Sequence, residues 1–125
     1  MKKLTLKIDN NEFFFVNESE DTRYGFRHVC HLFINDYDRA TISHPYYNRT
    51  WEAYTYQTVM MEAIQAVMDE IYESELRYYK ERNDIKRLTA AKRQKFEDDF
   101  NNQTYKSLQE AYTEIKNEIP KGFEW

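Results

Sequence analysis

The chain has 125 residues, of which 41% are hydrophobic and 17% aromatic, and its formal net charge is −4. These values are typical of one folded domain (residues 1–125), and the aromatic content argues against a disordered chain. The only cysteine excludes an internal disulfide, and no apolar run approaches the roughly 18 residues that a membrane span needs. We therefore expect a cytoplasmic protein without a signal peptide.

Residues 1–45 show the patterns of a β-sheet. Leu4, Leu6 and Ile8 alternate with polar residues, as in a strand with one buried face. A polar, acidic stretch at 17–21 is interpreted as a connection. Strands are predicted at residues 4–8, 13–16, 24–34 and 39–44, with turns at 9–12 and 35–38.

Residues 46–125 are predicted to be helical, since neither Gly nor Pro interrupts residues 46–119. A first helix is expected from about Asn48, with Asn48 or Thr50 as N-cap, to about Arg82. A helix of that length exceeds what a small sheet covers, so its distal half should project. This half keeps an apolar stripe that needs a partner, made of Tyr72, Leu76 and Tyr79.

A second helix is expected to begin after an N-cap at Thr89 and to continue to Ile119. The predicted fold class is therefore α+β, an antiparallel four-stranded sheet followed by a long two-helix antiparallel hairpin that covers one sheet face. The projecting stripe can pack on this second helix or on another copy of the chain. The sequence leaves open whether the chain is a monomer or a homodimer.

All three histidines and the only cysteine fall within residues 28–44. His28 and Cys30 share the more apolar face of the third strand, and His44 lies on the corresponding face of the fourth. Two imidazoles and a thiolate are ligands that zinc accepts, so His28, Cys30 and His44 form a candidate metal site. It depends on Cys30 lying opposite His44, in a register that pairs Ile34 with Ala40 and Leu32 with Ile42.

A core without metal is the alternative for these residues. A buried cysteine can be a small hydrophobe, and a half-buried histidine can hydrogen-bond a backbone carbonyl. A catalytic zinc is not expected, since no His-Glu pair at helical spacing supplies a base. Cys30 and His31 cannot act as a nucleophile and base, because neighbours on a strand point to opposite faces.

Charged residues are unevenly distributed along the chain. Residues 80–95 contain seven Lys or Arg and two carboxylates, which predicts a basic tip between the helices. Residues 9–21 contain five carboxylates and no Lys or Arg, which predicts an acidic sheet end. Both are candidate partner-binding surfaces unless they are only solvated faces. The candidate residues are Asp9, Glu12, Glu18, Glu20, Asp21, Lys86, Arg87, Lys92 and Arg93.

The segment around the strand-to-helix junction resembles a signature of small proteins from phages and mobile elements. It reads Tyr46-Tyr47-Asn48-Arg49-Thr50-Trp51-Glu52 and continues through Tyr54, Tyr56, Gln57, Thr58 and Val59. Within that group the chain looks most like anti-CRISPR proteins of type II-A, which inhibit Cas9. The resemblance covers about residues 25–68 and implies a protein that acts in the cytoplasm of a bacterial host cell.

The function implied by the resemblance is inhibition without catalysis. The chain would bind a CRISPR effector nuclease, Cas9 in the first instance, and block nucleic-acid engagement or cleavage. Nucleic acid could be contacted through that partner. Two alternatives remain open, a small nucleic-acid-binding accessory protein and a small zinc metalloprotein.

Overall fold

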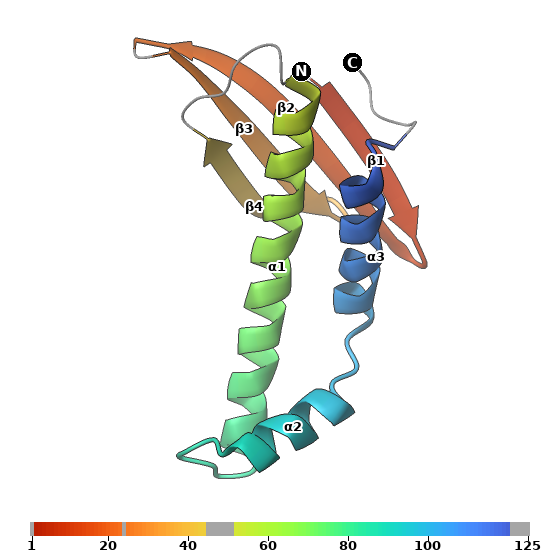
Figure 1. Ribbon diagram of the computed structural model, residues 1–125. Coiled ribbons are helices and arrows are strands. Elements are labelled where there is room, and N and C mark those ends of the chain that lie inside the picture. The colour runs from red at the N-terminus through yellow and green to blue at the C-terminus, as the bar shows by residue number, and fades with distance from the viewer. Residues whose placement is uncertain (1, 24, 45–51, 121–125) are drawn as a thin grey trace.

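The computed structural model describes residues 2–23, 25–44 and 52–120 (Figure 1). In these ranges four antiparallel strands form one sheet in the order β1-β2-β3-β4, and three helices follow. The α+β class and the four-stranded sheet are confirmed. The elements are β1 (Lys2–Ile8), β2 (Asn11–Thr22), β3 (Gly25–Ile34), β4 (Tyr37–His44), α1 (Glu52–Arg82), α2 (Ala90–Asp99) and α3 (Gln103–Asn117).

The helix α1 extends beyond the sheet. Its 31 residues span roughly 46 Å at about 1.5 Å per residue. Figure 1 shows its first half on the sheet and its second half projecting, with α2 near the far end and α3 returning beside β1. We call residues 72–99 the helical arm. The predicted N-caps Asn48 and Thr50 lie outside the described residues, as does the rest of the signature segment before Glu52.

The predicted two-helix hairpin is wrong in its second half. In place of one helix continuing to Ile119, the structure has two helices, α2 and α3. The break falls at Phe100, whose backbone is extended (φ −65°, ψ 115°). Asn102 then caps α3, its side-chain oxygen accepting a hydrogen bond from the Tyr105 amide at 3.1 Å. Asparagine side chains compete with the helical backbone for hydrogen bonds, so this stretch favours a stop and restart. The N-cap predicted at Thr89 is confirmed, with the Lys92 amide as donor at 3.3 Å.

The predicted connection at 17–21 is also wrong, because β2 continues through it to Thr22. This part of β2 pairs with β3, from Asn17 opposite Cys30 to Thr22 opposite Gly25. Asn17 is fully buried, and its amide donates to the Lys2 carbonyl at 3.3 Å. Polarity suggested a loop here, but pairing with β3 satisfies the backbone.

The core lies between one sheet face and the helices α1 and α3. Cys30, Leu32 and Ile34 of β3 point into it, as strand alternation predicts. None of the helices in the described ranges is long and apolar enough to cross a bilayer. The fully buried members contributed by the other elements are Leu4, Phe13, Phe15, Val59, Met60, Ala63, Ile64, Val67, Leu108, Ala111 and Ile115.

The turn between β3 and β4 is shorter than predicted and changes the register. It has two residues, Asn35 and Asp36, with φ of 51° and 71°. Asn and Asp tolerate this left-handed conformation, which two-residue hairpins favour. Ile34 therefore pairs with Tyr37, and after an irregularity Leu32 pairs with Ala40. The predicted pairing of Ile34 with Ala40 is wrong by two residues, an even shift that leaves every side chain on its predicted face.

Candidate functional site

The observed register separates the predicted metal ligands. His28 lies opposite His44, whereas Cys30 lies opposite Ile42. The prediction that Cys30 faces His44 is therefore wrong, because the two-residue turn moves β4 along β3. Within the described residues, no group of three His, Cys, Asp or Glu side chains is placed to hold a metal ion. Zinc stays a prediction that this geometry does not favour.

The two histidines have separate hydrogen-bond partners. Buried His28 contacts the Ser19 hydroxyl through Nδ1 at 3.1 Å, and its ring packs edge-on against Tyr56 at 5.3 Å. The Tyr56 hydroxyl lies 3.3 Å from the same Ser19 oxygen. His44 contacts the Glu62 carboxylate on α1 through Nε2. These contacts position the sheet against α1.

Cys30 is fully buried in the core. Burial raises the pKa of its thiol well above the usual range, because the thiolate would lose its hydration. A protonated thiol is neither a strong nucleophile nor a good metal ligand. Cys30 therefore behaves as a small core hydrophobe.

We predict that the Cys30 thiol of the folded protein reacts slowly with a thiol reagent even at pH 9, and quickly after denaturation. Its raised native pKa also means that the native state keeps the proton while the unfolded thiol ionises. This contribution to stability is present below about pH 8.5 and is lost as the pH rises further. Titration with a chromogenic disulfide checks reactivity, and unfolding curves compared with Cys30→Val check the pH slope. Fast labelling of native protein would contradict the assignment.

The residues that were predicted to form one acidic sheet end lie on two separate surfaces. Glu12 and Glu20 are eight positions apart on β2, roughly 26 Å at about 3.3 Å per residue. Glu12 lies beside the β3–β4 turn, since the Asn35 amide donates to its carbonyl at 2.9 Å. The turn end thus groups Asp9, Glu12, Asp36 and Asp38, whereas Glu18, Glu20 and Asp21 follow β2 toward the other end.

Asp9 has a structural role that sequence reasoning missed. Its carboxylate accepts hydrogen bonds from Gln103 at 2.9 Å and from Ser107 at 3.3 Å, both on α3. Ser107 is fully buried and also accepts from Asn11 at 3.2 Å. These bonds join residues more than ninety positions apart, so no local pattern could have indicated them. Asp9 fastens the β1–β2 turn to the start of α3.

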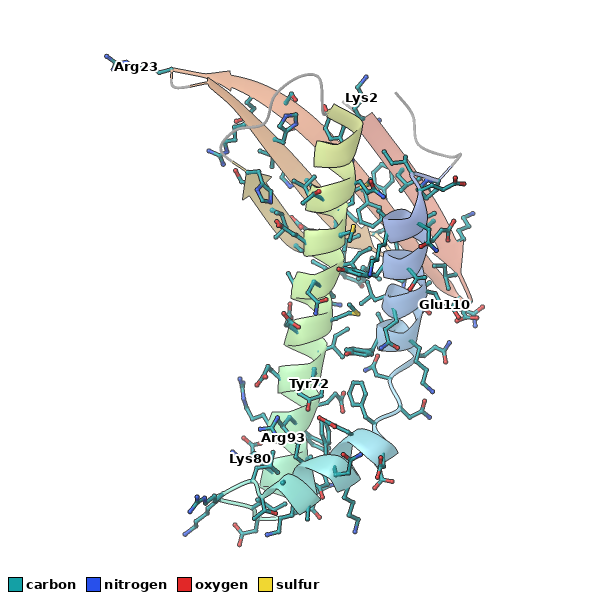
Figure 2. All side chains as sticks on the ribbon, viewed as in Figure 1. Lys2, Arg23, Tyr72, Lys80, Arg93 and Glu110 are labelled. Atoms are coloured by element: carbon teal, nitrogen blue, oxygen red, sulfur yellow. The ribbon has the colours of Figure 1, made fainter. Side chains whose placement is uncertain are left out.

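The predicted basic residues gather at the end of the helical arm. Figure 2 places Lys80 and Arg93 there, and Arg23 at the opposite extremity of the sheet. Among the described residues the ion pairs are Lys7–Glu12, Arg39–Glu70 and His44–Glu62, none of them at this end. We call the following seven residues, all but half-buried Lys80 exposed, the basic tip: Lys80, Arg82, Lys86, Arg87, Lys92, Arg93 and Lys95.

The charges of α2 are reversed relative to the helix dipole. The dipole favours acidic residues in the first turn of a helix and basic residues in the last turn. The first turn of α2 has no acidic residue and its last turn has no basic one. Lys92 and Arg93 lie near the positive end, and Glu97 to Asp99 near the negative end. Helix stability therefore does not explain these cations, whereas an anionic partner would.

We predict that Lys92→Glu stabilises the protein by about 0.5 kcal/mol or more, because it completes a capping box with Thr89 and suits the dipole. Lys92 is exposed and third in the helix after its cap, so no packing is lost. Urea denaturation measures the change. Lys95→Glu is the matched control, with the same charge change outside the first turn. A lower stability for Lys92→Glu would contradict the dipole argument.

An aromatic cluster holds α2 against α1. Phe96 is 5% exposed, with its ring 5.6 Å from Tyr72 and 5.3 Å from Tyr79. The stripe of Tyr72, Leu76 and Tyr79 is thus partnered within the chain. Tyr72 also donates to Glu97 at 2.7 Å. This bond, and then burial, raises the pKa of Tyr72, with Arg93 acting in the opposite direction.

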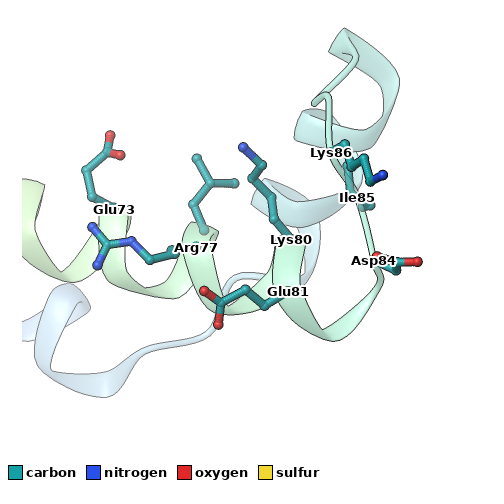
Figure 3. Close-up of a pocket in the computed structure, with 8 residues that line it drawn as sticks. Glu73, Arg77, Lys80, Glu81, Asp84, Ile85 and Lys86 are labelled. Atoms are coloured by element: carbon teal, nitrogen blue, oxygen red, sulfur yellow. The ribbon is translucent and has the colours of Figure 1, made fainter.

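Two grooves lie along the arm. One, of about 430 Å³, has buried Leu76 and half-buried Ile85 in its lining, with charges of both signs around them (Figure 3). Its charged residues are Glu73, Arg77, Lys80, Glu81, Asp84 and Lys86. The second, of about 220 Å³, lies where α1 meets the α2–α3 junction and contains Tyr78 and Arg82. Neither groove was indicated by the sequence, because the first needs the loop after α1 folded back on that helix, and the second needs the α2–α3 junction beside α1.

The arm therefore combines exposed cations with two shallow grooves, an arrangement suited to binding a large anionic partner. No protein-family model, curated protein or solved structure matches the chain, so its function has to be argued from its own residues.

Proposed function

We propose that this chain is a non-catalytic inhibitor of the anti-CRISPR type. It binds a CRISPR effector nuclease, Cas9 in the first instance, and blocks nucleic-acid engagement or cleavage by occupying space. The resemblance of the segment around the strand-to-helix junction supports the choice of target. The basic tip supports the mode of binding.

One observation carries the proposal, namely the exposed cations that gather at the end of a projecting arm. The described ion pairs leave them out, and Lys92 and Arg93 oppose the dipole of α2. Exposed cations that gather on one surface, two of them placed against the helix dipole, are best explained by a partner of opposite charge. On a nuclease that holds RNA and DNA, the phosphates supply that charge.

The position of the basic tip suits steric inhibition. The arm projects beyond the sheet (Figure 1). It can therefore reach bound nucleic acid while the sheet stays outside and obstructs the path of the target. The acidic surfaces offer a second contact, because carboxylates bind the Lys and Arg side chains that line nucleic-acid channels. Glu18 and Glu20 lie in the second half of β2, away from the β1–β2 turn that carries Asp9.

A second candidate is a nucleic-acid-binding accessory protein, which the same tip favours. In that case the phosphates of free DNA or RNA are the partner, and affinity falls steeply with salt. The two candidates differ in whether the effector protein is needed for tight binding.

The test is a pulldown of guide-free and guide-loaded Cas9 with the purified chain, together with a DNA-cleavage assay. We expect a stable complex with the loaded enzyme and loss of cleavage. Lys86→Glu/Lys92→Glu should weaken the complex by about tenfold or more. Lys3→Glu/Lys116→Glu, on β1 and α3, is the matched control, with an equal charge change far from the arm.

Absence of a complex with either form of the effector, together with undiminished cleavage, would reject the inhibitor. Binding to free nucleic acid at the same affinity, without the effector, would favour the accessory protein. Equal weakening by the tip and control variants would show that net charge, and not the tip, governs binding.

A further inference from the structure

The helical arm carries an exposed tyrosine, Tyr78, that takes no part in the aromatic cluster between α1 and α2. Among the described residues, the exposed large hydrophobic side chains are Tyr37, at 75%, and Tyr78, at 59%. Tyr79, the next residue, packs against Phe96, whereas Tyr78 does not share in that cluster. The guanidinium carbon of Arg82 lies 5.5 Å from the Tyr78 ring centroid. The two residues are one helical turn apart and form a joint aromatic and cationic platform.

This platform borders the smaller groove, of about 220 Å³. Asn101 and Asn102 contribute amides to its lining, and Glu75 and Asp99 contribute carboxylates. The groove thus offers a flat ring, a cation and several hydrogen-bond acceptors in a small space. Its size suits one planar group better than a drug-sized ligand, which needs about 300 Å³ or more.

We propose that this groove takes one unpaired nucleobase of a single-stranded nucleic acid, stacked on Tyr78, while the phosphates on either side follow the basic tip. The inference rests on the proposed function, since it specifies the nucleic acid that the tip contacts. Stacking of bases on aromatic side chains beside cations is how proteins hold single strands without reading much sequence.

The charges in the groove indicate a base and not a phosphate. The carboxylates of Glu75 and Asp99 repel phosphate, whereas the exocyclic amino groups of bases donate to such oxygens. Lys92 and Lys95 precede Asp99 on α2 by seven and four positions, so they lie on the same side of the helix. The phosphates next to the stacked base would meet these lysines.

A duplex cannot use the groove in this way. Its bases are stacked and paired inside the double helix. Extruding a base from a duplex therefore costs unpairing free energy, whereas a base of an unpaired strand is already free to enter the groove. The phosphates of a duplex still contact the basic tip. The structure therefore assigns a preference for single strands to Tyr78 and salt-dependent attraction to the lysines.

The test measures fluorescence anisotropy of a labelled strand of about 12 nucleotides, as DNA and as RNA, alone and as a duplex, over a range of salt. We expect tighter binding of the single strand. Tyr78→Ala should weaken it by about 5- to 100-fold without changing the salt slope, and Tyr78→Phe should bind nearly as the parent chain does. Tyr37→Ala, at the more exposed tyrosine that begins β4, is the matched control and should change nothing.

Lys92→Glu should instead reduce the salt slope, because it removes a phosphate contact. Equal affinity for strand and duplex, or a Tyr78→Ala variant that binds like the parent, would overturn the inference. So would absence of strand binding at low salt. None of these results would decide the pulldown with Cas9, so failure of the inference and failure of the proposed function can be told apart.

Discussion

Replacing Phe15 by alanine is expected to lower the free energy of unfolding by about 3–5 kcal/mol. Phe15 is fully buried in the middle of β2, between Leu4 of β1 and Leu32 of β3, which are also fully buried. The truncation loses the transfer free energy of a benzyl group and leaves a cavity that three strands and the helices cannot close. Urea denaturation followed by circular dichroism measures the loss.

Phe14 is the matched control on the same strand. It points to the opposite face, where the helices do not cover it, and is half-buried with its ring 6.1 Å from that of Phe33. Phe14→Ala should cost only about 1 kcal/mol, the value of an aromatic pair on a sheet surface. A cost for Phe14→Ala equal to that of Phe15→Ala would mean that both sheet faces are equally buried, which would contradict this assignment.

Replacing Phe96 by alanine is expected to release α2 from the arm, with a local loss of about 3–5 kcal/mol. Phe96 is 5% exposed and is the buried residue of α2, with rings of Tyr72, Tyr79 and Phe100 all within 5.6 Å of its own. A helix of ten residues is marginal in water, so without this anchor α2 should unfold. Hydrogen exchange followed by mass spectrometry should show residues 90–99 losing protection.

The sheet should keep its protection in the Phe96→Ala variant, since the main core lies between the strands, α1 and α3. Lys95→Ala, at the exposed neighbouring position, controls for a change in α2 that leaves the anchor intact. Unchanged exchange of residues 90–99 in Phe96→Ala would show that another contact holds α2. Loss of protection throughout the chain would show that arm and sheet unfold as one unit.

The Phe96 variant also connects stability with the proposed function. Unfolding of α2 would scatter Lys92, Arg93 and Lys95 and remove one wall of the Tyr78 groove. We therefore expect Phe96→Ala to weaken nucleic-acid binding although it removes no charge. Lys92→Glu should have the opposite combination, a more stable helix and weaker binding. Such opposite effects are expected where residues serve a partner and not the fold.

Local patterns predicted most of the elements correctly. Alternation of Leu4, Leu6 and Ile8 identified β1, and the helical stripe of α1 ends at Arg82 as expected. The assignment of sheet faces was also correct, because side-chain alternation depends only on the strand itself. The polar stretch 17–21 was misread because strand pairing, and not residue polarity, keeps it extended. The break at Phe100 was missed because helical spacing continues through it in the sequence.

The charge of the candidate site could be predicted from the sequence, but its geometry could not. Runs of Lys and Arg indicated the basic tip, because the end of α1, a short loop and the start of α2 keep residues 80–95 close together in space. The supposed acidic end extends along an elongated strand, so residues near one another in sequence lie far apart. The metal cluster depended on a register that the two-residue turn at Asn35 and Asp36 decided otherwise.

The sequence by itself therefore determined the fold class, the buried faces of β1, β3 and β4, the N-cap at Thr89 and the basic tip. Each is a property of neighbours along the chain. Only the tertiary structure decided which distant side chains meet: Asp9 with α3, His44 with Glu62, and Tyr78 and Arg82 with Asn102 beside one groove. Those contacts depend on where turns and helix breaks bring distant segments together, which is a balance of packing over the whole core.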